Sequence, residues 1–93
     1  MIRSFHDEPT RAVWERRYTK SIGPDLAKQA YKKLAMIDAA TTINDLRIPP
    51  KNRLEKLEGE RTGQHSIRIN DQFRICFTWR NGGADNVHII DYH

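Results

Sequence analysis

The chain has 93 residues, of which 38% are hydrophobic, so it can build one compact core and is too short for two domains. Its 16 lysines and arginines against 12 aspartates and glutamates give a formal net charge of +4, which favours partners that carry phosphate or acidic groups. A single cysteine, Cys76, excludes an intramolecular disulfide. No apolar run resembles a signal peptide or spans a bilayer, so we expect a cytoplasmic protein without a membrane partner.

Two helices are predicted in the first half of the chain, after residues 1–5, which fit a strand of the later sheet. Asp7 suits the N-cap of the first helix and Pro9 suits its first turn, so this helix should run over residues 9–18. Three residues would form its apolar side: Val13, Trp14 and Tyr18.

The second helix has the most regular pattern in the chain. Pro24 and Asp25 fit its first turn, and an apolar stripe follows at helical spacing. The stripe consists of Leu26, Ala30, Leu34 and Ile37. Three lysines off the stripe fit either a solvated face or a contact with RNA phosphate or an acidic partner. They are Lys28, Lys32 and Lys33.

The remaining chain is predicted to form most of one sheet. A proline loop over residues 47–53 and a brief strand over residues 54–57 precede a hairpin centred on residues 66–77. A glycine-rich connection, residues 80–85, leads to a last strand over residues 86–92. This order predicts an α+β domain in which two N-terminal helices pack on one face of a small, mainly antiparallel sheet of four to five strands.

The register of the hairpin decides which side chains share a face, because strand side chains alternate with a period of two. A three-residue connection, residues 70–72, sets Ile67 opposite Ile75 on the core side and leaves Arg68 and Arg74 as neighbours on the other face. We expect that face to be open, polar and basic. The two arginines fit either solvated side chains or a site for an anion such as phosphate, whose oxygens match guanidinium groups.

The chain closes on Asp91, Tyr92 and His93, which together supply candidate proton donors and acceptors. Strand alternation places Tyr92, with His88, on the face of the arginines. The same tripeptide also fits a solvated tail. The four histidines lack the spacing of common metal motifs, so no metal site and no cofactor are expected.

Several stretches resemble the HigB toxins of the RelE/ParE superfamily of bacterial type II toxin–antitoxin systems. They are residues 1–5, residues 57–61 with Gly63, residues 66–75 and the closing tripeptide, residues 91–93. The resemblance covers nearly the whole chain, and it depends on the order and spacing of these stretches together. It implies a RelE-like fold and a ribosome-associated endoribonuclease that cuts mRNA during translation by metal-free transesterification.

The resemblance also implies residues and partners. Asp91, Tyr92 and His93 match catalytic positions, and Arg74 matches an arginine near the scissile phosphate. Further residues expected to bind RNA are Arg53, Lys56, Arg68 and His88. The implied partners are a HigA-like helix-turn-helix antitoxin and the ribosome with its mRNA, with operator DNA reached only indirectly through the antitoxin. Some members carry a histidine where Glu55 stands here, so that role would fall to His88 or His93, or to none.

Two rival functions share some of these features. A related toxin could act on DNA gyrase through protein contacts, without needing the closing tripeptide, and would cause DNA damage. A small nucleic-acid-binding module without chemistry would bind with strong salt dependence and leave RNA intact. The nuclease is favoured because a basic face and a set of proton-transfer residues converge on the same end of the sheet.

Overall fold

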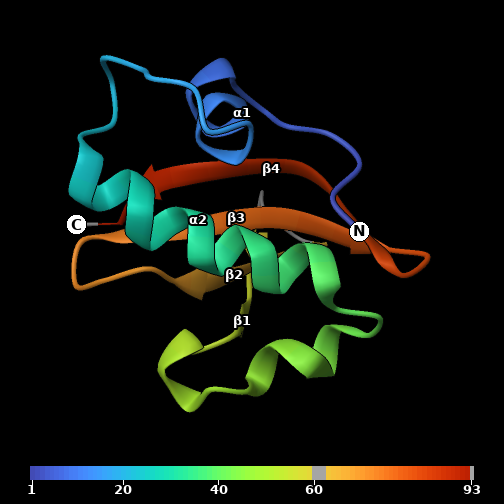
Figure 1. Cartoon of the computed structure of the whole chain (residues 1–93). Coiled ribbons are helices and arrows are strands. Elements are labelled where there is room, and N and C mark those ends of the chain that lie inside the picture. The colour runs from blue at the N-terminus through green and yellow to red at the C-terminus, as the bar shows by residue number, and fades with distance from the viewer. Residues whose placement is uncertain (60–62, 93) are drawn as a thin grey trace.

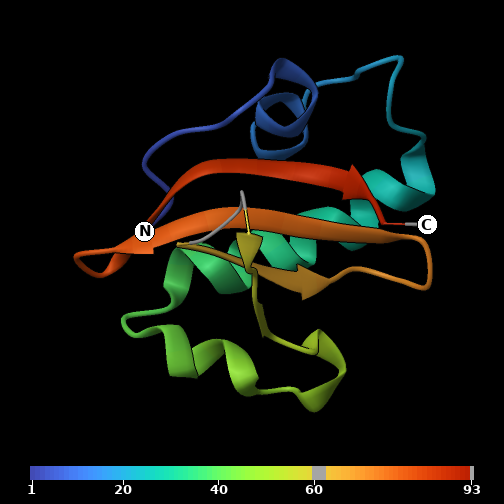
Figure 2. The ribbon, with the colours of Figure 1, turned by 180° about the vertical axis from the view of Figure 1, so that it is seen from behind.

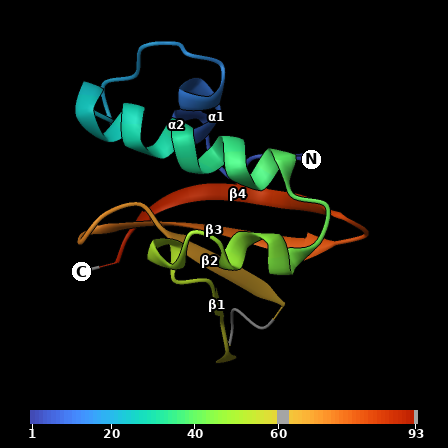
Figure 3. The same ribbon diagram turned by 60° about the horizontal axis from the view of Figure 1, so that its bottom comes forward.

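The computed structural model describes residues 1–59 and 63–92 of the chain. In this part of the chain the elements, shown in Figure 1, are α1 (Glu8–Trp14), α2 (Pro24–Ala39), the 3-10 turns η1 (Ile43–Arg47) and η2 (Pro50–Asn52), β1 (Glu55–Lys56), β2 (Gln64–Arg68), β3 (Phe73–Arg80) and β4 (Gly83–Asp91). The strands form one antiparallel sheet in the order β1-β2-β3-β4. Both α-helices lie on one side of it (Figure 3), which confirms the predicted α+β fold.

The first helix is capped by the side chain of Asp7, as predicted, but it ends at Trp14. Arg16 has a left-handed backbone with φ of 58°, and the N–H groups of Arg16 and Arg17 bond back to the last turn as a Schellman motif. Tyr18 therefore lies beyond the helix and is 84% exposed. Its predicted place on the apolar side of the helix is wrong.

The apolar stripe predicted on the second helix is confirmed. Ala30, Leu34 and Ile37 are fully buried, and Leu26 is partly buried against the same core. They belong to one core cluster with side chains of the strands, and Figure 1 shows α2 lying over the sheet. The strand side chains of this core are Ile67, Ile75, Phe77, Ala84 and Val87.

The predicted register of the central hairpin is confirmed. Ile67 pairs with Ile75, and Arg68 pairs with Arg74. The connection is held by Asn70, whose side-chain Oδ1 accepts hydrogen bonds of 2.9 Å from two backbone N–H groups, those of Gln72 and Phe73. The two arginines therefore lie side by side on the face opposite the helices.

The last strand begins earlier than predicted, at Gly83. Asn81 and Gly82 both have positive φ, of 49° and 73°, which makes a tight two-residue turn between β3 and β4 (Figure 2). A register shift near Asn86, whose φ is 53°, then inserts one residue into β4. Downstream of this bulge, alternation turns Val87 into the core, as the sequence pattern predicts.

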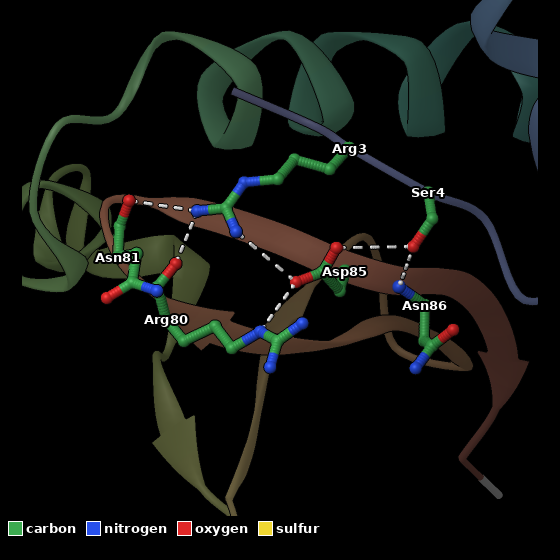
Figure 4. Close-up of polar contacts among 6 residues, drawn as sticks. All are labelled: Arg3, Ser4, Arg80, Asn81, Asp85 and Asn86. Carbon is green, nitrogen blue, oxygen red and sulfur yellow. Dashed lines mark hydrogen bonds and ion pairs between the residues drawn. The ribbon is translucent and has the colours of Figure 1, made fainter.

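The N-terminal segment runs beside β4 through two isolated parallel bridges rather than as a regular strand. Its side chains fasten the turn between β3 and β4 (Figure 4). The guanidinium of Arg3 donates to the carbonyl oxygens of Arg80 and Asn81 and lies 3.5 Å from the Asp85 carboxylate. The hydroxyl of Ser4 accepts a hydrogen bond of 2.9 Å from a backbone N–H of β4. Polar contacts of the N-terminal segment thus hold it against the turn between β3 and β4 and the start of β4.

The sheet face away from the helices is less open than predicted. Ser66, Arg74 and Cys76 on this face are all buried. The long side chain of Arg74 accounts for part of this, because it bonds to Ser66 on the neighbouring strand and to the backbone that precedes β1. The expectation of an open basic face is wrong, and a cleft lies at one end of this face.

We expect Arg3→Met to lower the free energy of unfolding by about 1–2 kcal/mol, because it removes charged hydrogen bonds to two carbonyl oxygens while keeping the aliphatic stem. Urea denaturation followed by circular dichroism measures this loss. Lys20→Met is the control, since Lys20 is exposed. Equal stabilities of the two variants would contradict a clamp at Arg3.

Candidate functional site

A cleft of about 720 Å³ opens where the end of the sheet meets the loop that leads into β1. Its lining includes seven residues that are charged or aromatic: Lys51, Arg53, Glu55, Arg68, Asp71, Arg74 and Tyr92. Of the residues predicted from sequence to act in catalysis or RNA binding, Arg53, Arg68, Arg74 and Tyr92 meet here. Residues from the loop, two central strands and the C-terminal end of the chain thus converge on one space.

Arg74 forms the fixed base of this cleft and is only 6% exposed. Its Nε donates to the Ser66 hydroxyl at 2.8 Å, and its Nη2 donates to the backbone carbonyls of Arg53 at 2.6 Å and Ser66 at 3.2 Å. Its Nη1 lies 3.3 Å from a carboxylate oxygen of Glu55. Three hydrogen bonds to Ser66 and Arg53 therefore fix the guanidinium plane, and Nη1 is the nitrogen whose partner is a half-exposed carboxylate.

Arg68 lies beside Arg74 with an ion pair of its own. Its Nη2 contacts the carboxylate of Asp71 in the hairpin connection, and its side chain is 30% exposed. Because each of the two arginines has a separate carboxylate neighbour, their mutual repulsion is partly offset without a bound anion. Arg68 is therefore the more adaptable of the two guanidinium groups.

The C-terminal end of the chain is held against the hairpin. The backbone N–H of Tyr92 donates to the carbonyl of Gln72 at 2.8 Å, and the Arg74 guanidinium lies 5.3 Å from the centre of the Tyr92 ring. The ring is half-exposed and covers one side of the cleft, which is a cation–π arrangement. Up to Tyr92 the tripeptide is therefore not a solvated tail.

The other two members of the tripeptide differ from Tyr92. Asp91 pairs with Phe73 and so points to the opposite face of the strand, as alternation predicts, and its Oδ2 accepts from the Gln72 amide at 3.0 Å. It does not line the cleft. His93, predicted to be catalytic, lies outside the described residues.

Two of the residues expected to bind RNA lie elsewhere. Lys56 follows Glu55 on β1 and so faces the opposite side, where it pairs with His65. His88 pairs with Cys76 and its ring lies 4.5 Å from that of His6, and it precedes the cleft along β4, since the cleft lies at Tyr92. The geometry thus groups Arg53 and Arg68, but not these two, with Arg74.

Lys51, Glu55 and Asp71 line the cleft, although none of them was predicted from the sequence as a site residue. Glu55 was noted only because the family resemblance places a histidine at its position in some members. The register between β1 and β2 pairs Glu55 with Ser66, which in turn lies opposite Cys76, and so places both residues on the face of Arg74. The brief strand predicted over residues 54–57 carried this information, but its pairing partner could not be read from the sequence.

A second hollow, of about 850 Å³, lies between the end of α1 and the outer side of α2. Apolar residues form most of its surface, among them Ile22, Ala27 and Tyr31, and basic side chains such as Lys28 surround it. It contains none of the predicted catalytic residues. Its apolar character fits a partner surface better than a phosphate site, so the cleft at Arg74 is the candidate for chemistry.

Within residues 1–59 and 63–92, no group of three or more histidine, cysteine or acidic side chains is arranged to hold a metal ion. In the same part of the chain no helix is long and apolar enough to cross a membrane. The charged and aromatic side chains that line the cleft carry guanidinium, ammonium, carboxylate and phenol groups.

The model of the HigB-like toxins, described as RelE-like toxins of type II toxin–antitoxin systems, matches residues 3–93. The chain belongs to the HigB-like toxin family. It is 49% identical over 90 residues to Toxin HigB-1 of Vibrio cholerae, with 96% of this chain and 95% of the relative covered. It is 31% identical to the Endoribonuclease HigB of Proteus vulgaris, with both chains covered in full.

Solved structures show the same fold in distant toxins. The chain superposes on a chain of the YoeB–YefM complex from Staphylococcus aureus with a TM-score of 0.64 and 20% sequence identity. The superposition covers 100% of this chain and 98% of the other. The likeness extends over the whole HigB-like domain and shows the fold alone. The RelE-like architecture expected from the sequence is thus confirmed.

On the opposite side of β2 from the cleft, burial lowers the pKa of His65, and the nearby positive charges of Lys56 and Arg47 lower it further. The folded state therefore favours neutral His65, whereas the unfolded chain takes up a proton below a pH of about 6.5. Stability from this residue is present at pH 7.5 and is lost as the pH falls through 6.5 and below. We expect His65→Phe to lessen the fall in unfolding free energy between pH 7.5 and pH 5, measured by urea denaturation.

The control for this pH dependence is His6→Phe, because His6 is exposed at the surface. This variant should retain the fall in stability seen in the wild-type protein. A His65→Phe variant that loses as much stability at pH 5 as the wild type would show that the neutral form of His65 is not favoured by folding.

Proposed function

We propose that this HigB-like toxin is a ribosome-dependent mRNA endonuclease that cuts transcripts during translation and so inhibits protein synthesis. The observation that carries the proposal is the Arg74 guanidinium, fixed by hydrogen bonds at the base of an electropositive cleft beside Tyr92. The relative from Proteus vulgaris is named an endoribonuclease, which supports the same activity here. Family membership supports a toxin that acts with an antitoxin partner.

The charge of the cleft suits a ribose-phosphate linkage. Its lining holds four basic side chains, Lys51, Arg53, Arg68 and Arg74, against two carboxylates, Glu55 and Asp71. Guanidinium groups bind phosphate oxygens in a planar, directional way and stay charged at every physiological pH. A single-stranded RNA can therefore place one phosphate over Arg74 while its bases remain free to stack, for which the exposed ring of Tyr92 is available.

The reaction is a transesterification within the RNA. The 2′-hydroxyl loses its proton to a base, its oxygen forms a bond to the adjacent phosphorus, and the bond from phosphorus to the 5′ oxygen breaks as that oxygen gains a proton. The products are a 2′,3′-cyclic phosphate and a 5′-hydroxyl. Negative charge builds up on the non-bridging oxygens in the transition state, and the fixed guanidinium of Arg74 stabilises it without reorganising.

The proton acceptor in this scheme is Glu55. Its carboxylate lies 3.3 Å from Arg74 Nη1, where a phosphate oxygen would bind, and its half-exposed side chain is free to turn aside when the phosphate arrives. The Glu55 carboxylate then lies beside the ribose-phosphate linkage whose 2′-hydroxyl reacts. Tyr92 helps to orient the phosphate because its ring packs against the Arg74 guanidinium that binds it. The family resemblance assigns Asp91 and His93 to the same reaction. In this scheme His93 gives a proton to the leaving 5′ oxygen.

The partners proposed for this toxin follow from its family. A HigA-like helix-turn-helix antitoxin inhibits it, and operator DNA is bound only through that antitoxin. The ribosome presents the mRNA strand to the cleft. The formal charge of +4 suits both an acidic antitoxin and a ribosomal surface rich in phosphate.

We expect Arg74→Lys to slow mRNA cleavage by about 10²-fold or more, since lysine keeps the charge but cannot make the bonds that orient Arg74. Cleavage is measured in a translation extract by mapping new 5′ ends on a reporter mRNA, and circular dichroism checks the fold. Arg16→Lys, outside the cleft, is the control and should cut like the wild type.

Two results would contradict the nuclease. A wild-type protein that damages DNA but leaves transcripts uncut would be a gyrase-directed toxin. A wild-type protein that binds RNA and never cuts it on the ribosome would be a binding module. Cleavage by Arg74→Lys at the wild-type rate would remove Arg74 from the chemistry.

Glu55→Gln separates binding from proton transfer. We expect it to lower the cleavage rate by about 10²–10⁴-fold, because the amide cannot accept the proton of the 2′-hydroxyl. The affinity for an uncleavable 2′-O-methyl RNA should stay equal or rise, since a negative charge leaves the cleft. Glu58→Gln, on an exposed residue next to β1, is the matched control. A fall in RNA affinity with an unchanged cleavage rate would assign Glu55 to structure instead.

A further inference from the structure

Three basic side chains at one side of the cleft have no acidic partner among the residues that the structure describes. Arg68 pairs with Asp71 and Arg74 pairs with Glu55, but no ion pair joins Lys33, Lys51 or Arg53 to a carboxylate. Lys51 and Arg53 line the cleft itself. The positive charge that is not neutralised therefore lies toward η2 and α2, and not at Arg74.

Lys33 is held beside the cleft from the second helix. Its Nζ donates a hydrogen bond of 2.7 Å to the side-chain Oδ1 of Asn52, the residue after Lys51 in η2. One helical turn before it, Gln29 accepts a hydrogen bond of 2.9 Å from Asn70 in the hairpin connection. Both contacts bind α2 to loops that border the cleft, so the ammonium group of Lys33 has a defined position.

Asn52 makes this position rigid. It is fully buried, and its Nδ2 donates to the carbonyl oxygens of Leu46 at 3.2 Å and Ile48 at 3.4 Å. The loop that carries Lys51 is therefore anchored to the same residue that fixes Lys33. An ammonium group has three donors, and Asn52 takes one of those on Lys33. The remaining donors are available to an anion.

The electrostatics around Lys33 fit an anion site. Burial lowers its pKa, and the positive charges of Arg68 and Lys51 lower it further. These cations repel one another in the absence of a ligand, and an anion among them would relieve the repulsion. Phosphates of a single strand are spaced regularly along the backbone, so a strand that places one phosphate at Arg74 brings a neighbouring one toward this cluster.

We propose that Lys33 and Lys51, fixed through Asn52, form a second phosphate subsite that binds a backbone phosphate adjacent to the one at Arg74. The subsite extends the RNA path from the cleft toward α2. This inference rests on the proposed function in that it takes RNA as the ligand and Arg74 as the site of the reacting phosphate. Lys33 and Lys51 contribute to binding and to the placement of the strand, and they take no part in the chemistry.

The competing explanation is that Lys33 serves only to satisfy the buried oxygen of Asn52. Lys33→Gln separates the two, because the amide still offers an N–H donor to Asn52 while the charge is lost. Lys51→Ala removes the second charge from an exposed position. The matched control is the double variant K28A/K32A, which removes two exposed lysines from the same helix and changes the net charge equally.

The test measures the binding of a fluorescent tetranucleotide with 2′-O-methyl groups, which cannot be cut, by anisotropy over a series of salt concentrations. Each phosphate contact to a single strand contributes about 0.7 to the slope of log affinity against log salt. The variant K33Q/K51A should therefore lose about 0.7 from the slope of the wild type, the share of the one phosphate bound at the subsite, whereas K28A/K32A should keep it. Urea denaturation checks that K33Q/K51A remains folded.

A K33Q/K51A slope equal to that of the wild type, or a loss of the same size in K28A/K32A, would overturn the subsite. Absence of measurable binding by the wild type would overturn it as well. Transcript mapping keeps the nuclease separate: if K33Q/K51A loses the slope but the wild type makes no cuts, the subsite stands and the nuclease falls. If the wild type cuts and the slope is unchanged, the nuclease stands without the subsite.

Discussion

The guanidinium group of Arg74 is buried at the end of the sheet, and the rest of the cleft is arranged to hold it there. A buried cation is costly unless hydrogen bonds and an opposite charge replace its water. The Ser66 hydroxyl, two backbone carbonyls and the Glu55 carboxylate provide that replacement. These groups come from different parts of the fold: Ser66 from β2, Glu55 from β1 and one carbonyl from the backbone turn at Arg53. The pairing of β1 with β2 and the turn at Arg53 therefore both help to fix the Arg74 side chain.

This arrangement explains how a small domain can pre-organise a phosphate site. Three contacts of Arg74 are to backbone carbonyls and a buried serine, and one is to a half-exposed carboxylate. In the proposed mechanism an incoming phosphate exchanges with Glu55 and not with the contacts that orient the guanidinium. The same exchange would release a proton acceptor next to the reacting hydroxyl. Arg68 and Lys51 of the neighbouring loop add positive charge around this fixed point.

Local patterns predicted much of this architecture. The stripe from Ala30 to Ile37 and the pairing of Arg68 with Arg74 follow from helical spacing and strand alternation. The early end of α1 did not follow, because a left-handed arginine, Arg16, closes it without the glycine that usually signals such a turn. The burial of Arg74 was also missed, since it depends on a carbonyl at Arg53 and on the pairing of a two-residue strand, which are long-range features.

The central claim is that the cleft activates the RNA's own 2′-hydroxyl against a phosphate held by Arg74, and the chemistry of the cut ends tests it most directly. Transcripts cut in a translation extract by the wild-type protein can be offered to RNA ligase with and without prior treatment by polynucleotide kinase. The account predicts 5′-hydroxyl ends, which become ligatable only after phosphorylation. Ends that carry a 5′-phosphate and ligate directly would show that water is the nucleophile, and would contradict the account.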